Sequence, residues 1–311
     1  MTTNCSLEGK VAIVTGAGVG IGRAIAIRLS TCGAHVIIND IDGNLAHEAE
    51  EAIINGSGDV AVVVGSVAVP NTAKEMVKAA SDRWGRLDIL VNSAGVIRDG
   101  KIDLLPDEWF GVAMDVFVEG TFLCIQACTP LMCSAAKAEL AAGKRVHRKI
   151  VNIASTAGIY GAAGRVSRAA ATAAVIGITK TVAREWARFL VNCNAVAPGL
   201  VSLHRDVGNQ STAHSTQIRT ESETQATTQE YSPLESQTLD LAQRVPPSDL
   251  EHPTSRSEEA TKSTQRMPLR RIGTPDDVAG AVAFLAGPDS DFITGVVLEV
   301  HGGMEVLNRD G

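Results

Sequence analysis

Residues 15–22 read TGAGVGIG, a glycine-rich stretch that follows the apolar run KVAIVT at residues 10–15. The apolar run has the β-branched character of a buried strand, and residues 23–31 after the glycines have the pattern of a helix. Glycine lets the chain turn tightly and lets a ligand approach the backbone. A helix that begins at such a turn directs free N–H groups and its positive dipole end toward phosphate. These residues predict a strand–turn–helix unit that binds the pyrophosphate of a dinucleotide.

The alternation of strand and helix continues to about residue 200 and resumes after residue 267. The candidate strands are continuous apolar runs, which is typical of parallel strands buried on both faces. We therefore expect an α/β fold with one doubly wound parallel sheet of about seven strands and helices on both faces. The expected strands are 10–15, 35–39, 60–64, 87–92, 149–153, 193–197 and 296–300, and the main expected helices are 23–31, 45–54, 71–84, 106–132 and 169–190.

Residues 203–266 differ from the rest of the chain, because they are rich in Ser, Thr, Gln and Glu and lack apolar periodicity. Such a composition favours a flexible or partly helical insertion over a second domain. The apolar pattern returns at residue 267, where Thr274 is a capping residue and Pro275 opens a helix. We predict a single domain over residues 1–311, interrupted by the polar insertion at 203–266.

The composition is that of an ordinary globular protein, with 45% hydrophobic residues, 20% charged residues and a formal net charge of −7. The negative charge argues against nucleic-acid or anionic-membrane partners, and we expect neither a secretory signal nor a membrane-spanning apolar segment. The six cysteines form no C-x-x-C pair, so we expect a reduced, cytoplasmic location and no metal site. The basic stretch KRVHRK at residues 144–149 is interpreted as a solvated loop before a strand.

An acidic residue, Asp40, stands at the end of the second expected strand. A carboxylate in this position accepts hydrogen bonds from the ribose hydroxyls of adenosine and repels a 2′-phosphate. The glycine loop carries Val19 and no arginine or lysine that would attract that phosphate. Both features predict NAD in preference to NADP.

These motifs resemble those of the classical short-chain dehydrogenases/reductases, especially the 3-oxoacyl-carrier-protein reductase and 3-hydroxyacyl dehydrogenase type, over about residues 5–202 and 267–303. Residues 15–22 fit the family pattern T-G-x-x-x-G-I-G, residues 92–95 (NSAG) resemble its N-N-A-G, and residues 198–199 match its P-G. The resemblance implies a Rossmann-like NAD-binding domain. The residues expected to bind the cofactor are Gly16, Gly18, Val19, Gly20, Ile21, Gly22, Asp40, Asn92, Ala94, Gly95, Pro198, Gly199 and Ser202.

The chain departs from the family at the residues that carry the chemistry. The family uses a tyrosine as proton donor, a lysine that lowers the pKa of the tyrosine, an asparagine that holds a water, and a serine. Here Phe117, Arg168 and Thr172 stand in the asparagine, tyrosine and lysine positions. Only the serine is present, as Ser155. The chain has only two tyrosines, and neither begins a Y-x-x-x-K motif.

Ordinary carbonyl reduction should therefore be severely impaired, since a positioned acid contributes about 10²–10⁴ in rate. The first hypothesis is a degenerate family member, a pseudoenzyme that keeps NAD as a ligand without reacting it. The second is an enzyme of cyclase, isomerase or lyase type that uses Arg168 as a fixed electrostatic group. The third is a residual NAD-dependent carbonyl or alcohol oxidoreductase that recruits Ser155, Tyr160 or water as the acid. Otherwise Ser155 is a structural serine and Tyr160 an aromatic wall of the pocket.

The resemblance also has implications for partners. The family pairs its long helices, here 106–132 and 169–190, so we expect a homodimer or a homotetramer. The insertion at 203–266 occupies the place of the family's substrate lid. A small-molecule ligand is expected, but the residues do not identify it.

Overall fold

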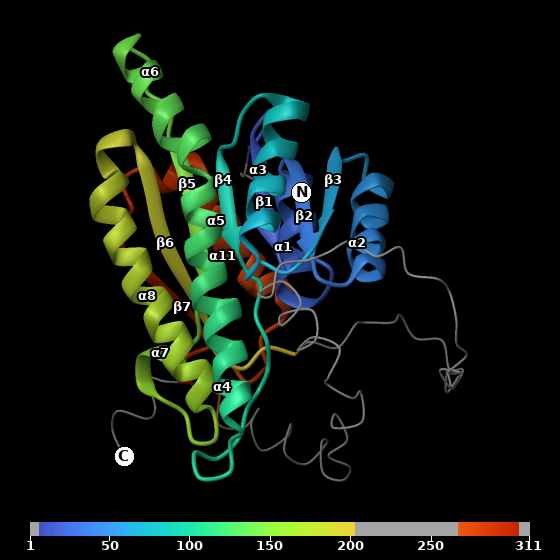
Figure 1. Cartoon of the computed structure of the whole chain (residues 1–311), viewed down its shortest axis with the longest axis vertical. Coiled ribbons are helices and arrows are strands. Elements are labelled where there is room, and N and C mark those ends of the chain that lie inside the picture. The colour runs from blue at the N-terminus through green and yellow to red at the C-terminus, as the bar shows by residue number, and fades with distance from the viewer. Residues whose placement is uncertain (1–5, 203–266, 305–311) are drawn as a thin grey trace. The chain divides into compact units, whose positions relative to one another are not determined.

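The computed structural model describes residues 6–202 and 267–304. Their strands are β1 (Val11–Thr15), β2 (His35–Asp40), β3 (Val60–Val64), β4 (Ile89–Asn92), β5 (Arg148–Ile153), β6 (Val191–Pro198) and β7 (Val297–Val300). They form a seven-stranded sheet in the order β3-β2-β1-β4-β5-β6-β7, with every neighbouring pair parallel (Figure 1). The order extends in both directions from β1 and β4, as in a doubly wound sheet. The predicted fold class is confirmed.

Helices cover both faces of the sheet (Figure 1). The described α-helices are α1 (Gly20–Thr31), α2 (Gly43–Asn55), α3 (Pro70–Trp84), α4 (Asp107–Ala113), α5 (Gly120–Ala127), α6 (Ala135–Ala141), α7 (Ala157–Tyr160), α8 (Val166–Trp186) and α11 (Pro275–Ala286). Buried residues of α1, α2 and α11 belong to one apolar cluster with the sheet. Buried residues of α3, α5 and α8 belong to a second cluster on the other face.

The side chains of β1 alternate between these two clusters. Val14 packs in the cluster under α1, α2 and α11, whereas Ile13 packs in the cluster under α3, α5 and α8. A strand between two helical layers has no side that faces solvent, which is why its sequence is an unbroken apolar run. Because all strands are parallel, their carboxyl ends meet at one edge of the sheet, and the loops that follow them gather there.

Several helices differ in their bounds from the sequence prediction; α8, for example, covers Val166–Trp186 where 169–190 is expected. The helix expected over 106–132 continues to Ala141, because two π-helical segments, Met114–Glu119 and Pro130–Ser134, join α4, α5 and α6 without a break. A π-helical segment absorbs an extra residue or a proline that would otherwise end a helix. The first helix begins at Gly20 and not at residue 23, so the last glycines of the loop belong to its first turn.

The long helix Asp107–Ala141 corrects the prediction that no segment resembles a membrane span. It contains an 18-residue window with a mean hydropathy of 1.5, so it is long and apolar enough to cross a bilayer by length and composition. A core helix of a globular domain passes the same test, and 39% of this window is buried inside the structure. The helix is apolar partly because Cys124, Ile125 and Met132 pack against the sheet.

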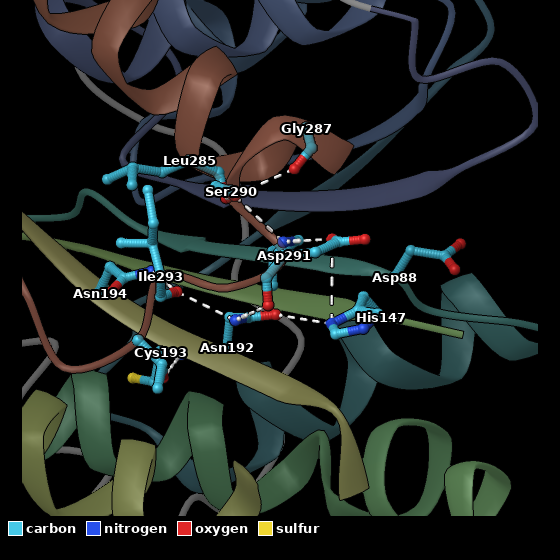
Figure 2. A network of polar contacts seen from close by, with 12 residues as sticks. Asp88, His147, Asn192, Cys193, Asn194, Leu285, Gly287, Ser290, Asp291 and Ile293 are labelled. Carbon is cyan, nitrogen blue, oxygen red and sulfur yellow. Dashed lines mark hydrogen bonds and ion pairs between the residues drawn. The ribbon is translucent and has the colours of Figure 1, made fainter. Parts of the chain in front are cut away.

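A polar network at the amino ends of β5 and β6 ties the chain after α11 to the sheet (Figure 2). Asn192 Nδ2 donates to the carbonyl oxygens of Asp291 and Ile293 at 3.0 and 2.9 Å. Lys149 Nζ donates to Ser290 Oγ at 3.0 Å and pairs with the Asp291 carboxylate at 2.8 Å. Burial lowers the pKa of Lys149, although its bond to Asp291 opposes this. The network lies at the edge of the sheet opposite the glycine loop, so we assign it a structural role.

The interpretation of residues 144–149 as a solvated loop is therefore wrong for the last two of them. Arg148 and Lys149 begin β5 and are only 2% and 3% exposed. Arg148 Nη1 donates to Glu139 at 2.8 Å. Both cations can be buried because acidic residues pair with them, Glu139 from α6 and Asp291 from the chain after α11. These partners lie outside the basic stretch, so the stretch alone does not predict the burial.

The polar insertion lies outside the described residues. Residues 203–266 are the insertion predicted within the single domain over 1–311, in the position of the family's substrate lid. The domain organisation therefore stays a prediction.

Candidate functional site

The glycine loop between β1 and α1 is shaped by contacts that glycine alone permits. Gly16 has a φ of 61°, and a Cβ on it would lie 2.6 Å from Ala94 Cα. A Cβ on Gly22 would lie 2.0 Å from the carbonyl oxygen of Gly16. The first turn of α1 carries no acidic residue, so nothing neutralises its positive dipole end. The loop is suited to receive a pyrophosphate.

Thr15 fixes the loop after β4 beside the glycine loop. Its Oγ1 accepts hydrogen bonds from the backbone N–H groups of Ser93 and Ala94 at 3.0 and 3.1 Å. Asn92 lies beneath this loop, and its Nδ2 donates to Asn152 Oδ1 at 2.8 Å. Asn92 therefore joins β4 to β5 and supports the site from below.

Asp40 lies at the end of β2 and contacts the glycine loop directly. The N–H of Gly18 donates to Asp40 Oδ2 at 2.9 Å, and the N–H of Asp42 donates to Oδ1 at 3.1 Å. Each carboxylate oxygen keeps further acceptor capacity, and Asp40 lines the adjoining cavity. These acceptors suit a ribose diol, whereas a 2′-phosphate would meet a negative charge.

A cavity of about 620 Å³ lies at the carboxyl ends of the strands. It brings together most of the residues that the sequence predicts for the cofactor and for the chemistry. The predicted residues that line it are Gly16, Val19, Gly20, Ile21, Gly22, Asp40, Ala94, Gly95, Phe117, Ser155, Arg168, Thr172, Pro198 and Gly199. The predicted residues that do not line it are Gly18, Asn92, Tyr160 and Ser202.

Tyr160 and Ser202 are held by other partners. The hydroxyl of Tyr160 contacts both carboxylate oxygens of Glu299, at 3.0 and 2.8 Å. The N–H of Ser202 donates to the carbonyl oxygen of Gly273 at 2.9 Å. Ser155 does line the cavity, and its Oγ accepts a hydrogen bond from the N–H of Ala157 at 3.2 Å, as a structural serine does.

At the position predicted to correspond to the family's tyrosine, the guanidinium of Arg168 is held by Asp99, which lies in the loop after β4. Arg168 Nη2 donates to Asp99 Oδ2 at 2.7 Å, and Arg165 Nε lies 3.7 Å from the same oxygen. Burial lowers the pKa of Arg168, and the Asp99 charge opposes that shift. An arginine nevertheless keeps its proton in a protein, so this position holds a fixed donor and no acid.

The other two residues predicted to depart from the family's catalytic set are Thr172 and Phe117. Thr172 is 0% exposed, and its hydroxyl donates to the carbonyl oxygen of Arg168 at 2.7 Å. Phe117 lies in the π-helical segment Met114–Glu119. A Cβ on Gly95 would lie 2.6 Å from the Phe117 ring, so the ring lies directly against the loop after β4. An apolar ring replaces the polar side chain that would hold a water.

The residues present fit a nicotinamide dinucleotide. The glycine loop would hold the pyrophosphate, Asp40 would bind the adenosine ribose, and residues 198–201 would border the nicotinamide. The fit rests on two features. The glycines carry no side chain that would fill the pyrophosphate position, and the Asp40 carboxylate offers acceptors. Such a cofactor exchanges a hydride with a substrate when it is bound.

Comparison with known proteins identifies the family. A family model described as short chain dehydrogenase matches residues 10–213, and one described as enoyl-(acyl carrier protein) reductase matches residues 248–305. A 3-oxoacyl-[acyl-carrier-protein] reductase of Synechocystis sp. is 32% identical over 301 residues, which are 96% of this chain and 98% of that protein. The (2S)-[(R)-hydroxy(phenyl)methyl]succinyl-CoA dehydrogenase subunit BbsD of Thauera aromatica is 31% identical, over 97% and 98% of the two chains. The chain belongs to the short-chain dehydrogenase/reductase family, as its motifs predict.

Solved structures agree with this assignment. A chain from Burkholderia xenovorans assigned to the short-chain dehydrogenases/reductases is 29% identical, with a TM-score of 0.74 over 96% of this chain and 98% of that chain. A chain from Sinorhizobium meliloti assigned to the short-chain alcohol dehydrogenases has a TM-score of 0.75 over 98% and 99% of the two chains. That second chain is 23% identical and supports the fold alone. Membership of the family makes NAD(P) the class of cofactor to expect.

Asp99 is the site residue that the sequence does not reveal. It is separated by 69 residues from Arg168, and no local pattern connects the two. The available signal is weak: an acidic residue soon after a parallel strand ends lies at the edge where ligands bind.

Proposed function

We propose that this chain is a pseudoenzyme of the short-chain dehydrogenase/reductase family, one that binds NAD(H) as a ligand and has lost carbonyl reduction. The observation that carries the proposal is the Arg168–Asp99 ion pair at the tyrosine position. The guanidinium of Arg168 keeps its proton, so it cannot deliver the proton that carbonyl reduction requires. The buried hydroxyl of Thr172 and the ring of Phe117 leave no replacement for the remaining relay groups. We place the protein in the cytoplasm.

Two measurements on the purified chain test this proposal together. NADH titration followed by nicotinamide fluorescence should show saturable binding. Reduction of acetoacetyl-CoA, a 3-oxoacyl thioester, should then be about 10²–10⁴ slower than for a family member with the full catalytic set. Turnover at the rate of such a reductase would refute the loss of chemistry. Absence of NADH binding would refute the role of the cavity as a cofactor site.

The preference for NAD over NADP depends on Asp40. We expect Asp40→Ala to weaken NADH binding and strengthen NADPH binding, shifting the ratio of the two dissociation constants by about tenfold or more. The reason is that alanine removes both the ribose acceptor and the charge that repels a 2′-phosphate. Asp42→Ala is the matched control, because Asp42 caps α2 and does not line the cavity. An unchanged ratio in Asp40→Ala would show that another residue sets the preference.

An enzyme of another class is the second candidate function. The observation that favours it is the acceptor Asp99 Oδ1, which is buried without a hydrogen-bond partner beside the Arg168 donor. Such a pair can act as base and oxyanion donor in an isomerase, cyclase or lyase. For any turnover found in a substrate screen, Arg168→Ala should abolish the activity and leave NADH affinity intact. Retained activity would exclude this role for Arg168.

We also propose that the chain forms a homodimer or homotetramer through the outer faces of α5 and α8. Phe122 of α5 is 50% exposed, and a Cβ on Gly177 of α8 would meet no atom within 4 Å. Light scattering at micromolar concentration should give a dimer or tetramer mass for the unmodified chain and a monomer mass for Phe122→Glu. Ile54→Glu is the control, since Ile54 is equally exposed (54%) but lies on α2. A monomeric unmodified chain would overturn the proposal.

A further inference from the structure

Three charged side chains meet at one end of the cavity. Asp99 Oδ2 accepts from Arg168 at 2.7 Å and lies 3.7 Å from Arg165 Nε. Two guanidinium groups thus share one carboxylate, which leaves one positive charge in excess. The other charged residue that lines the cavity, Asp40, belongs to the glycine-loop end and contacts Gly18 and Asp42.

The ion pair leaves hydrogen-bonding capacity unused. Arg168 Nε is buried and has no acceptor. A guanidinium carries five N–H donors, and Asp99 accepts from Nη2, so further donors of Arg168 remain for the oxygen acceptor of a ligand. Asp99 Oδ2 holds Arg168 Nη2 in place, so the guanidinium is oriented before a ligand arrives. A guanidinium presents its N–H groups as a planar fork that matches a carboxylate.

The walls beside this cluster are apolar. Val96 and Ile97 follow β4, Val116 and Phe117 come from the long helix, and Leu200 follows β6. They line the same cavity as the charged cluster. A ligand that fills this end should therefore have an apolar body with an acceptor group at the arginines.

We propose that Arg165 and Arg168 form a binding subsite for the carboxylate of a small ligand whose body is apolar. The excess positive charge selects an anion, and the planar N–H donors of the guanidinium groups select oxygen acceptors. Asp99 is a positioning residue that holds Arg168 and lowers the net charge of the subsite. The inference deepens the proposed function, because it names the ligand class for the substrate end of the same cavity.

Hexanoate and hexanamide test the subsite, because they share an apolar chain and differ in charge. We expect calorimetric titration of the full chain, with and without saturating NADH, to show at least about tenfold tighter binding of hexanoate. Arg168→Gln should abolish this preference and Arg165→Gln should reduce it. Arg184→Gln is the matched control, because Arg184 lies on α8 and does not line the cavity. Equal binding of the two compounds, no hexanoate binding, or an undiminished preference in Arg168→Gln would overturn the proposal.

Asp99→Asn gives a second test that keeps both arginines. We expect it to bind hexanoate several-fold more tightly, because the internal carboxylate no longer opposes the ligand's charge. If the ion pair were only structural, the variant would bind hexanoate no better than the unmodified chain. NADH titration of the same samples separates the two proposals. Intact NADH binding without hexanoate preference overturns the subsite alone, and lost NADH binding with retained preference overturns the cofactor role alone.

Discussion

The triple variant Phe117→Asn/Arg168→Tyr/Thr172→Lys should reduce acetoacetyl-CoA with NADH at least about 10²-fold faster than the unmodified chain. The substitutions restore a proton donor, a cation that lowers its pKa and a polar group for the relay. All three positions line the cavity, so the substitutions place the new side chains at the candidate site. Ser155 is already present at the same cavity. The measurement is the initial rate of NADH oxidation at saturating cofactor.

Two further variants serve as controls for the triple variant. Arg168→Phe in place of Arg168→Tyr keeps the ring but removes the hydroxyl, and it should show no gain in rate. A version that also carries Asp99→Asn guards against misfolding, because Asp99 loses its hydrogen-bonded cation when Arg168 is replaced and keeps only Arg165 at 3.7 Å. A folded triple variant that binds NADH and gains no activity would show that more than the lost side chains prevents reduction.

Gly22→Ala should abolish NADH binding and lower the free energy of unfolding by roughly 3 kcal/mol or more. The added Cβ would lie 2.0 Å from the carbonyl oxygen of Gly16, and backbone cannot yield as a flexible side chain does. The glycine loop must therefore move, and the cradle for a pyrophosphate is lost. Fluorescence titration with NADH and chemical denaturation measure the two effects.

Gly280→Ala is the matched control for this prediction. It makes the same substitution inside a helix, α11, where a Cβ meets no atom within 4 Å. Alanine favours the helix by about 0.5–1 kcal/mol over glycine, so this variant should be slightly more stable and should bind NADH normally. If Gly22→Ala behaved like Gly280→Ala, the loop would not depend on the close contact with Gly16.

The parts of the fold that sequence patterns predict correctly are those specified locally. The apolar run of β1, the glycines after it and Asp40 at the end of β2 each carry their signal within a few residues. The end of the long helix is different, because the sequence pattern places it at residue 132, whereas the helix continues through Pro130–Ser134 and α6 to Ala141. That outcome depends on packing against the sheet, which outweighs local helix propensity.

The candidate site likewise has features that the sequence predicts and features that only the tertiary structure shows. The sequence alone predicts that Phe117, Arg168 and Thr172 occupy the family's catalytic positions, and this prediction needs no structure. What those side chains bind is decided by the fold, since Arg168 meets Asp99 across 69 residues and Lys149 meets Ser290 across 141. A buried charge needs a partner, and in a parallel sheet the partner comes from another crossover, distant in the chain. The amino-acid order thus specified the groups, and the tertiary structure specified their pairing.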